Sequence, residues 1–209
     1  VKSNIKAVRL SPGRTLVEWE LTIEKSNKRP PLPRAGLTFK LPKDFTQVSW
    51  YGEGPWENYA DRVDSSMLGI WNAVVDVSSG LAGADGKIKY IENGLNPDNY
   101  IEPGEQGYRT DCRWVEFKNS NGASVKITAL DKTFGFNAWP YTQDTIDIVK
   151  HQYLLNKENF ITVNIDAAQM GVGGDNSWGA RPHWHTMLNS KKYSLKFLVE
   201  EKGTDLFTK

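Results

Sequence analysis

The stretch that decides the fold is Val17-Glu18-Trp19-Glu20-Leu21-Thr22-Ile23, in which apolar and polar side chains alternate without a break. Successive side chains of a β-strand point to opposite faces, so this pattern is typical of a strand with one buried face. The same period recurs at residues 37–41, 125–129, 161–165 and 193–199, with shorter runs at 48–51, 74–77 and 114–117. We therefore expect an all-β protein.

Turn residues separate these runs, and no segment of crossover-helix length lies between them, which favours mostly antiparallel sheets. Asn121-Gly122 lies between two strand runs and predicts a hairpin turn, because both residues tolerate positive φ. One short helix is expected over residues 142–150, where Thr142 can cap the first turn. A second helical turn is predicted over residues 55–59, because proline suits a first-turn position.

The amino-acid composition limits the classes of protein to which this chain can belong. Of the 209 residues, 39% are hydrophobic and 24% charged, which is typical of one folded domain and not of a disordered chain. The net charge of +1 comes without a basic run and argues against a nucleic-acid partner. No apolar stretch approaches the roughly 20 residues of a membrane span. A single cysteine, Cys112, excludes an internal disulfide, and a buried inert thiol is its default role.

The N-terminal sequence Val1-Lys2-Ser3-Asn4 resembles neither a signal peptide nor an initiator-methionine start. We interpret it as a cut inside a longer protein, and we make no prediction of localisation. The eight tryptophans call for a large core or a ligand surface. Trp19, Trp50 and Trp114 fall in strand runs and are expected in the core.

The first dense block runs from Trp50 to Arg62 and gathers carboxylates and aromatic rings around a Gly-Pro turn. A sugar site and a structural corner both fit it, and the spacing favours a corner in which Arg62 pairs with Glu57 or Asp61. A hydrolytic pair of Glu53 and Glu57 is disfavoured, because nothing in the sequence marks either carboxyl group as buried.

The second block runs from Tyr100 to Asp111 and predicts an ordered loop held by ion pairs, in which Arg109 and Asp111 share one face. The third runs from Met170 to Pro182 and is rich in glycine. It lacks the helix start and lysine of a phosphate loop, and a strand is expected after it. We therefore predict a tight loop that presents Trp178, either as a sugar platform or as a plug of the sandwich end.

His183 and His185 flank Trp184. On a strand both imidazoles would face one way and could hold a metal. The chain has only three histidines and no cysteine near these two. The sequence therefore predicts no metal site, and catalytic use of Cys112 is disfavoured too.

The three blocks together resemble the C-terminal domain of family 2 β-galactosidases, also called domain 5 or the small-chain domain. That family's Tyr/Trp-x-Gly-x-Gly-Pro-x-Glu-Asn-Tyr-x-Asp-Arg pattern matches the segment ending at Arg62. Its Tyr-Ile-x-Pro-x-Glu-x-Gly-x-Arg-Thr-Asp-x-Arg-Trp pattern matches residues 100–114, and its Met-Gly-x-Gly-Gly-Asp-Asp-Ser-Trp pattern matches residues 170–178. The resemblance implies an antiparallel supersandwich similar to that of aldose mutarotases.

The resemblance also implies a division of labour in a retaining β-galactosidase. The catalytic glutamates and a magnesium site belong to a (β/α)₈ barrel, which needs about 250 residues and cannot lie in this chain. This segment would hold no catalytic residue and no metal, and Trp178 would stack on the galactoside substrate. The loop-supporting residues it implies are Gly173, Gly174, Asp175, Asn176 and Ser177. The structural motif residues it implies are Gly54, Pro55, Glu57, Asn58, Asp61, Arg62, Arg109 and Asp111.

Three departures from the family pattern stand out. Residues 78–99 are polar and glycine-rich and read as an inserted loop or hairpin, and Asn176 replaces an aspartate. The N-terminal part is shorter than in the family, which predicts an open sheet edge. The expected partners are the other domains of the parent enzyme, itself a homo-oligomer.

The sequence also fits two other functions. A free-standing carbohydrate-binding module would use the exposed aromatic rings. A mutarotase-like isomerase would need an acid and a base in one cleft, with His151, His183 or His185 as one of them.

Overall fold

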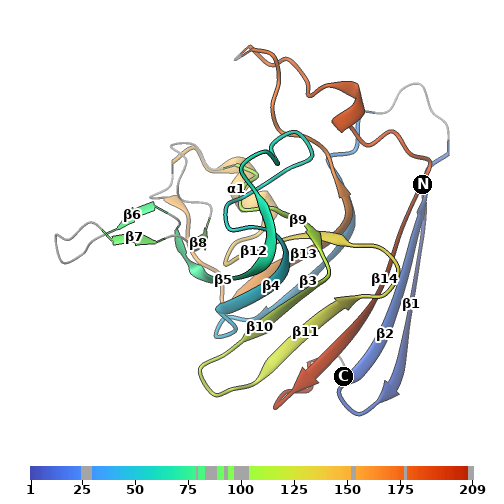
Figure 1. Ribbon diagram of the computed structural model, residues 1–209, viewed down its shortest axis with the longest axis vertical. Coiled ribbons are helices and arrows are strands. Elements are labelled where there is room, and N and C mark those ends of the chain that lie inside the picture. The colour runs from blue at the N-terminus through green and yellow to red at the C-terminus, as the bar shows by residue number, and fades with distance from the viewer. Residues whose placement is uncertain are drawn as a thin grey trace.

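The computed structural model describes residues 1–24, 30–78, 80–82, 89–91, 94–96, 104–151, 154–176 and 178–206 (Figure 1). Two large sheets pack face to face and enclose the hydrophobic core between them. This confirms an all-β sandwich with one short α-helix. Within the described residues, no helix is long and apolar enough to cross a bilayer.

The larger sheet has eight strands. Their spatial order is β1 (Lys2–Ser11), β2 (Arg14–Thr22), β14 (Lys192–Lys202), β11 (Ser124–Ala129), β10 (Trp114–Lys118), β4 (Gln47–Gly54), β5 (Met67–Ser78) and β8 (Gly94–Asn96). Neighbours pair antiparallel except β5 and β8, which are parallel. β1 forms one edge of this sheet.

The smaller sheet has four strands. Their order is β3 (Arg34–Pro42), β13 (Phe160–Gln169), β12 (Phe134–Trp139) and β9 (Arg109–Cys112), and all pair antiparallel. A separate antiparallel pair, β6 (Gly80–Ala82) and β7 (Lys89–Ile91), projects from the sandwich within the segment expected to be inserted (Figure 1).

The core forms where alternate residues of facing strands meet. Val17 and Trp19 of β2 and Trp50 of β4 are buried there, which confirms two of the three predicted core tryptophans. Trp114 was predicted wrongly, because the register of β10 turns Val115 and Phe117 inward. Its half-buried indole lies on the opposite face, where the Lys126 ammonium sits 4.5 Å from the ring centroid.

Every strand predicted from alternation is present, whereas β1, β8, β9 and β12 were missed. The sequence of β12, Phe-Gly-Phe-Asn-Ala-Trp, shows no regular alternation of apolar and polar side chains, and all six residues are buried. In β1 every residue but Ser11 is exposed, so burial selects no pattern there. Period-2 reasoning finds strands whose apolar and polar side chains alternate, and these include β13, although both of its faces are buried.

The predicted helix and hairpin are confirmed. Helix α1 (Gln143–Ile148) begins after Thr142, whose side chain accepts a hydrogen bond from the Thr145 amide at 3.1 Å. Gly122 takes φ of +84° in the turn between β10 and β11. The helical turn predicted over residues 55–59 is wrong. The Asn58 amide donates to the carbonyl of Tyr108, just before β9, at 2.8 Å, so it makes a distant contact instead of a bond within a helical turn.

Candidate functional site

The three sequence blocks meet at one end of the sandwich, away from the β10–β11 turn (Figure 1). We name residues 55–62 the central loop and residues 170–182 the Trp178 loop. The central loop follows β4, and the Gly54–Pro55 peptide bond at its start is cis. Three of its polar side chains reach out to the other two blocks.

Glu57 joins the central loop to the second block. Its Oε1 lies 2.9 Å from Nη2 of Arg62, and its Oε2 accepts from the Gly107 amide at 2.7 Å. Both carboxylate oxygens therefore have partners. This arrangement is the structural corner that the spacing favoured, and it leaves Glu57 without a free oxygen for chemistry.

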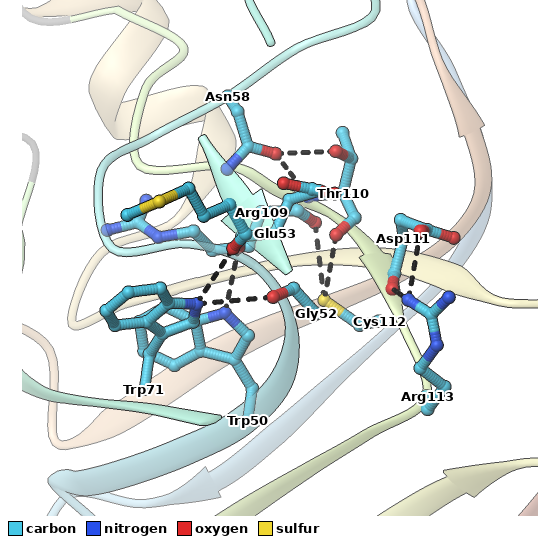
Figure 2. A network of polar contacts seen from close by, with 11 residues as sticks. Trp50, Gly52, Glu53, Asn58, Trp71, Arg109, Thr110, Asp111, Cys112 and Arg113 are labelled. Atoms are coloured by element: carbon cyan, nitrogen blue, oxygen red, sulfur yellow. Dashed lines mark hydrogen bonds and ion pairs between the residues drawn. The ribbon is translucent and has the colours of Figure 1, made fainter. Parts of the chain in front are cut away.

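Asn58 is fully buried and makes the second link. Its Oδ1 accepts from the amide of Thr110 at 2.7 Å and from the Thr110 hydroxyl at 2.6 Å, and its Nδ2 donates to the carbonyl of Trp56 at 3.0 Å. Side chains that satisfy buried backbone groups in this way fix loop conformation. Figure 2 shows this bridge beside the β9 strand.

Asp61 makes the third link, to the Trp178 loop. Its Oδ1 accepts from the Val172 amide at 3.1 Å and its Oδ2 from the Gly173 amide at 2.8 Å. Gly171 must be glycine here, because a Cβ atom would collide with the Asp61 carboxylate and lie 2.8 Å from the Thr186 hydroxyl. The central loop therefore carries the base of the Trp178 loop.

Trp178 itself is 93% exposed. Asn176 Oδ1 accepts from the Trp178 amide at 2.8 Å and from the Ala180 amide at 3.4 Å, and Gly179 takes φ of +93°. At Gly174 a Cβ atom would collide with the carbonyl of Ala180. Trp178 therefore does not plug the end of the sandwich, since a ring in that role would be covered.

A hollow of about 380 Å³ lies at the foot of the Trp178 loop. Its wall includes Asp61, Asp175, His183 and His185. His183 and His185 do not lie on a strand, contrary to expectation: His183 precedes the short 3-10 helix η2 (Trp184–Thr186). His183 Nε2 lies 2.7 Å from Oδ1 of Asp175. The described residues contain no cluster of three or more side chains suited to hold a metal ion.

Arg109 and Asp111 do not share a face, which corrects the expectation for the second block (Figure 2). Asp111 has φ of +55°, so the strand geometry breaks there, and its carboxylate pairs with Arg113 at 2.9 Å. The Arg109 guanidinium is buried 5.2 Å from the ring centroid of Trp50, and burial lowers its pKa to about 10.

Cys112 is buried as expected, and burial raises the pKa of its thiol. Its sulfur lies 3.4 Å from the carbonyl oxygen of Thr110 and beneath Gly52 (Figure 2). Ser177 and residues 100–103 of the second block lie outside the described residues.

A family model described as beta galactosidase small chain matches residues 8–79 and 96–199. The chain belongs to the β-galactosidase small-chain family. All three blocks that build the site fall within the matched residues. Residues 80–95, which include β6 and β7, fall between the matched segments, and their status as an insertion stays a prediction.

Curated relatives of this small-chain domain are much longer proteins. Beta-galactosidases from Halalkalibacterium halodurans and Streptococcus thermophilus are each 33% identical, over 171 and 172 residues respectively, 82% of this chain and 15% of the relative. That from Vibrio cholerae is 33% identical over 192 residues, 92% of this chain and 16% of the relative. This chain therefore spans about one sixth of the length of the relatives it matches.

Sequence reasoning missed a buried polar cluster in this small-chain domain. Arg34 lies 3.0 Å from Asp166 and 3.7 Å from Glu105, and Glu105 also accepts from Asn137 at 2.7 Å. Burial raises the pKa of Glu105 to about 7 and that of Asp166 to about 6, against the opposing effect of Arg34. No local pattern could reveal this cluster, because β3 and β13 bring together residues far apart in the chain.

This cluster predicts that stability falls as pH rises. In the folded state the pKa values of Glu105 and Asp166 lie above their ordinary values of 4.5 and 3.8. The native state therefore binds more protons than the unfolded state. The stabilisation is complete below about pH 4 and is lost as the pH rises through 6 and 7. Urea unfolding between pH 4 and 8 should show this decline, and Glu105→Gln should flatten it. An identical slope in wild type and Glu105→Gln would contradict the assignment.

Proposed function

We propose that this chain is the small-chain domain of an enzyme that hydrolyses terminal β-D-galactosides with retention of configuration, and that it contributes Trp178 to the sugar site. The observation that carries the proposal is the indole of Trp178, 93% exposed on a loop that two backbone amides tie to Asp61. An exposed aromatic ring on an ordered loop is available for a ligand to cover.

A rigidly held aromatic ring suits sugar recognition. The C–H face of a pyranose is apolar, so an indole face can cover it while hydroxyl groups stay available to polar side chains. Asn176, Asp61 and the glycines of the Trp178 loop restrict the backbone before the ligand arrives. A loop ordered in advance loses less conformational entropy on binding.

The catalytic carboxylates are assigned to another domain of the parent enzyme. Both oxygens of Glu57 have partners, and Glu105 and Asp166 contact Arg34 in the interior. A retaining glycosidase needs two carboxyl groups about 5–5.5 Å apart that flank the sugar, and one must be open to it. The magnesium of the parent enzyme is likewise assigned to its barrel, as the family resemblance implies.

The test of this division of labour is direct. The purified 209-residue chain is assayed with a chromogenic β-galactoside beside the full-length enzyme. We expect no turnover by the chain alone and turnover by the full-length enzyme. Turnover by a chain preparation free of other galactosidases would overturn the assignment of the carboxylates.

A second candidate function is an autonomous carbohydrate-binding module. It is favoured by the exposure of Trp184 as well as Trp178, at 77% and 93%. Such a module would bind galactosides without the barrel. Titration of the isolated chain with galactosides, followed by tryptophan fluorescence, separates the two functions: saturable binding that Trp178→Ala abolishes would favour the module.

A further inference from the structure

The Trp178 loop is crossed by a contact that the sugar-site proposal does not use. Asp175 lies three residues before Trp178 and His183 five residues after it, and His183 Nε2 lies 2.7 Å from Asp175 Oδ1. The contact therefore joins the two limbs of the loop on either side of the tryptophan. Within the ring so formed, Asn176 accepts from the amides of Trp178 and Ala180.

The two anchors of the loop are of different kinds. Asp61 holds the entering limb through backbone amides of Val172 and Gly173, which carry no titratable group. The Asp175–His183 contact holds the segment that bears Trp178, and it closes a loop of a few residues, which removes conformational freedom. The strength of the Asp175–His183 contact depends on the charge of the His183 imidazole.

We propose that His183 is a positioning residue for the sugar site: through its contact with Asp175 it holds the Trp178 indole in the orientation that meets the galactoside. The proposal rests on the proposed function of Trp178. His183 would not touch the substrate, and its effect would pass entirely through the loop.

The surroundings of His183 fix how the clamp responds to pH. The Asp175 carboxylate raises the pKa of His183 above its ordinary value of 6.5. The His185 ring lies edge-on with its centroid 5.7 Å away, and Asp61 lines the same hollow. Because pairing raises the pKa, the clamp is complete below about pH 6.5 and is lost as the pH rises through the raised value.

The first test measures KM and kcat of the full-length enzyme from pH 5.5 to 9. His183→Ala and Asp175→Asn are compared with the control variant His151→Ala, whose exposed histidine does not line the hollow. At pH 6 we expect His183→Ala to raise KM about two- to fivefold, the size that an exposed ion pair supports, with little change in kcat. The ratio of variant to wild-type KM cancels the pH effects of the catalytic groups, and it should approach one at high pH. Asp175→Asn should give the same ratio as His183→Ala, and His151→Ala should keep the wild-type profile.

The second test follows the loop without activity. The 209-residue chain is labelled with 5-fluorotryptophan, and the ¹⁹F resonance of Trp178 is assigned with Trp178→Phe. We expect this resonance to titrate with His183 in wild type and in His151→Ala. It should not titrate in His183→Ala or Asp175→Asn.

The two tests separate the possible failures. A Trp178 resonance that titrates in all variants as in wild type would overturn the clamp, whatever the kinetics. A clamp that behaves as expected by ¹⁹F, with KM ratios of one at every pH, would overturn its role at the sugar site. Failure of the proposed function is recognised differently: Trp178→Ala itself would then leave KM and kcat unchanged.

Discussion

Replacing Trp178 with alanine is expected to lower kcat/KM of the full-length enzyme for β-galactosides by about 10- to 100-fold. The estimate follows from covering one aromatic side chain, which stabilises a complex by about 1.5–3 kcal/mol. Because the indole is 93% exposed, the free energy of unfolding of the chain should change by less than about 0.5 kcal/mol. Steady-state kinetics and urea unfolding measure the two quantities.

Trp184→Ala is the matched control for this variant. Trp184 is also exposed, at 77%, and lies six residues further along the chain in η2. We expect its loss to change kcat/KM much less, since no loop of the site presents it. Equal losses in the two variants would show that exposure of any indole on this face matters, and not the position of Trp178.

Replacing Trp50 with alanine should have the opposite profile, with a loss of about 3–5 kcal/mol in the free energy of unfolding. Trp50 is fully buried, its Nε1 donates to the Glu53 carbonyl at 3.0 Å, and Phe136 meets its ring edge-on with centroids 5.8 Å apart. The ring also covers the buried Arg109 guanidinium (Figure 2). A cavity next to a poorly solvated cation adds to the cost.

Urea unfolding of the isolated chain tests this prediction, with Trp114→Ala as the control. Trp114 occupies β10 on the same sheet but is half-buried on its outer face. We expect its removal to cost less than half as much. If Trp50→Ala proved no more destabilising than Trp114→Ala, the placement of Trp50 at the centre of the core would be wrong.

Alternation predicted the strands whose apolar and polar side chains alternate, which are most of the larger sheet and, in the smaller sheet, β3 and β13, although both faces of β13 are buried. It failed at β12, whose residues follow no regular alternation, and at Trp114, where a strand run has its large ring on the outside. Period-2 reasoning locates a strand but does not say which set of alternate residues faces inward. The register with β4 and β11 decides that, and it depends on distant parts of the chain.

The site shows the same limit. The residue types of the three blocks indicated ordered loops, and the resemblance singled out Trp178. Which polar side chain holds which loop depends on contacts between segments about 50 to 110 residues apart, such as Glu57 with Gly107 and Asp61 with Gly173. The prediction that Arg109 and Asp111 share one face failed for a local reason, because the strand geometry breaks at the positive φ of Asp111 and its carboxylate pairs with Arg113.

The central claim is that this domain brings an aromatic wall, and not the catalytic carboxylates, to a galactoside site. The most direct measurement is a crystal structure of the full-length enzyme with a galactose-configured inhibitor bound. The account predicts the Trp178 indole within about 4–4.5 Å of the ligand and two carboxylates from another domain flanking the anomeric carbon. An inhibitor bound away from Trp178, or flanked by carboxylates of this chain, would contradict it.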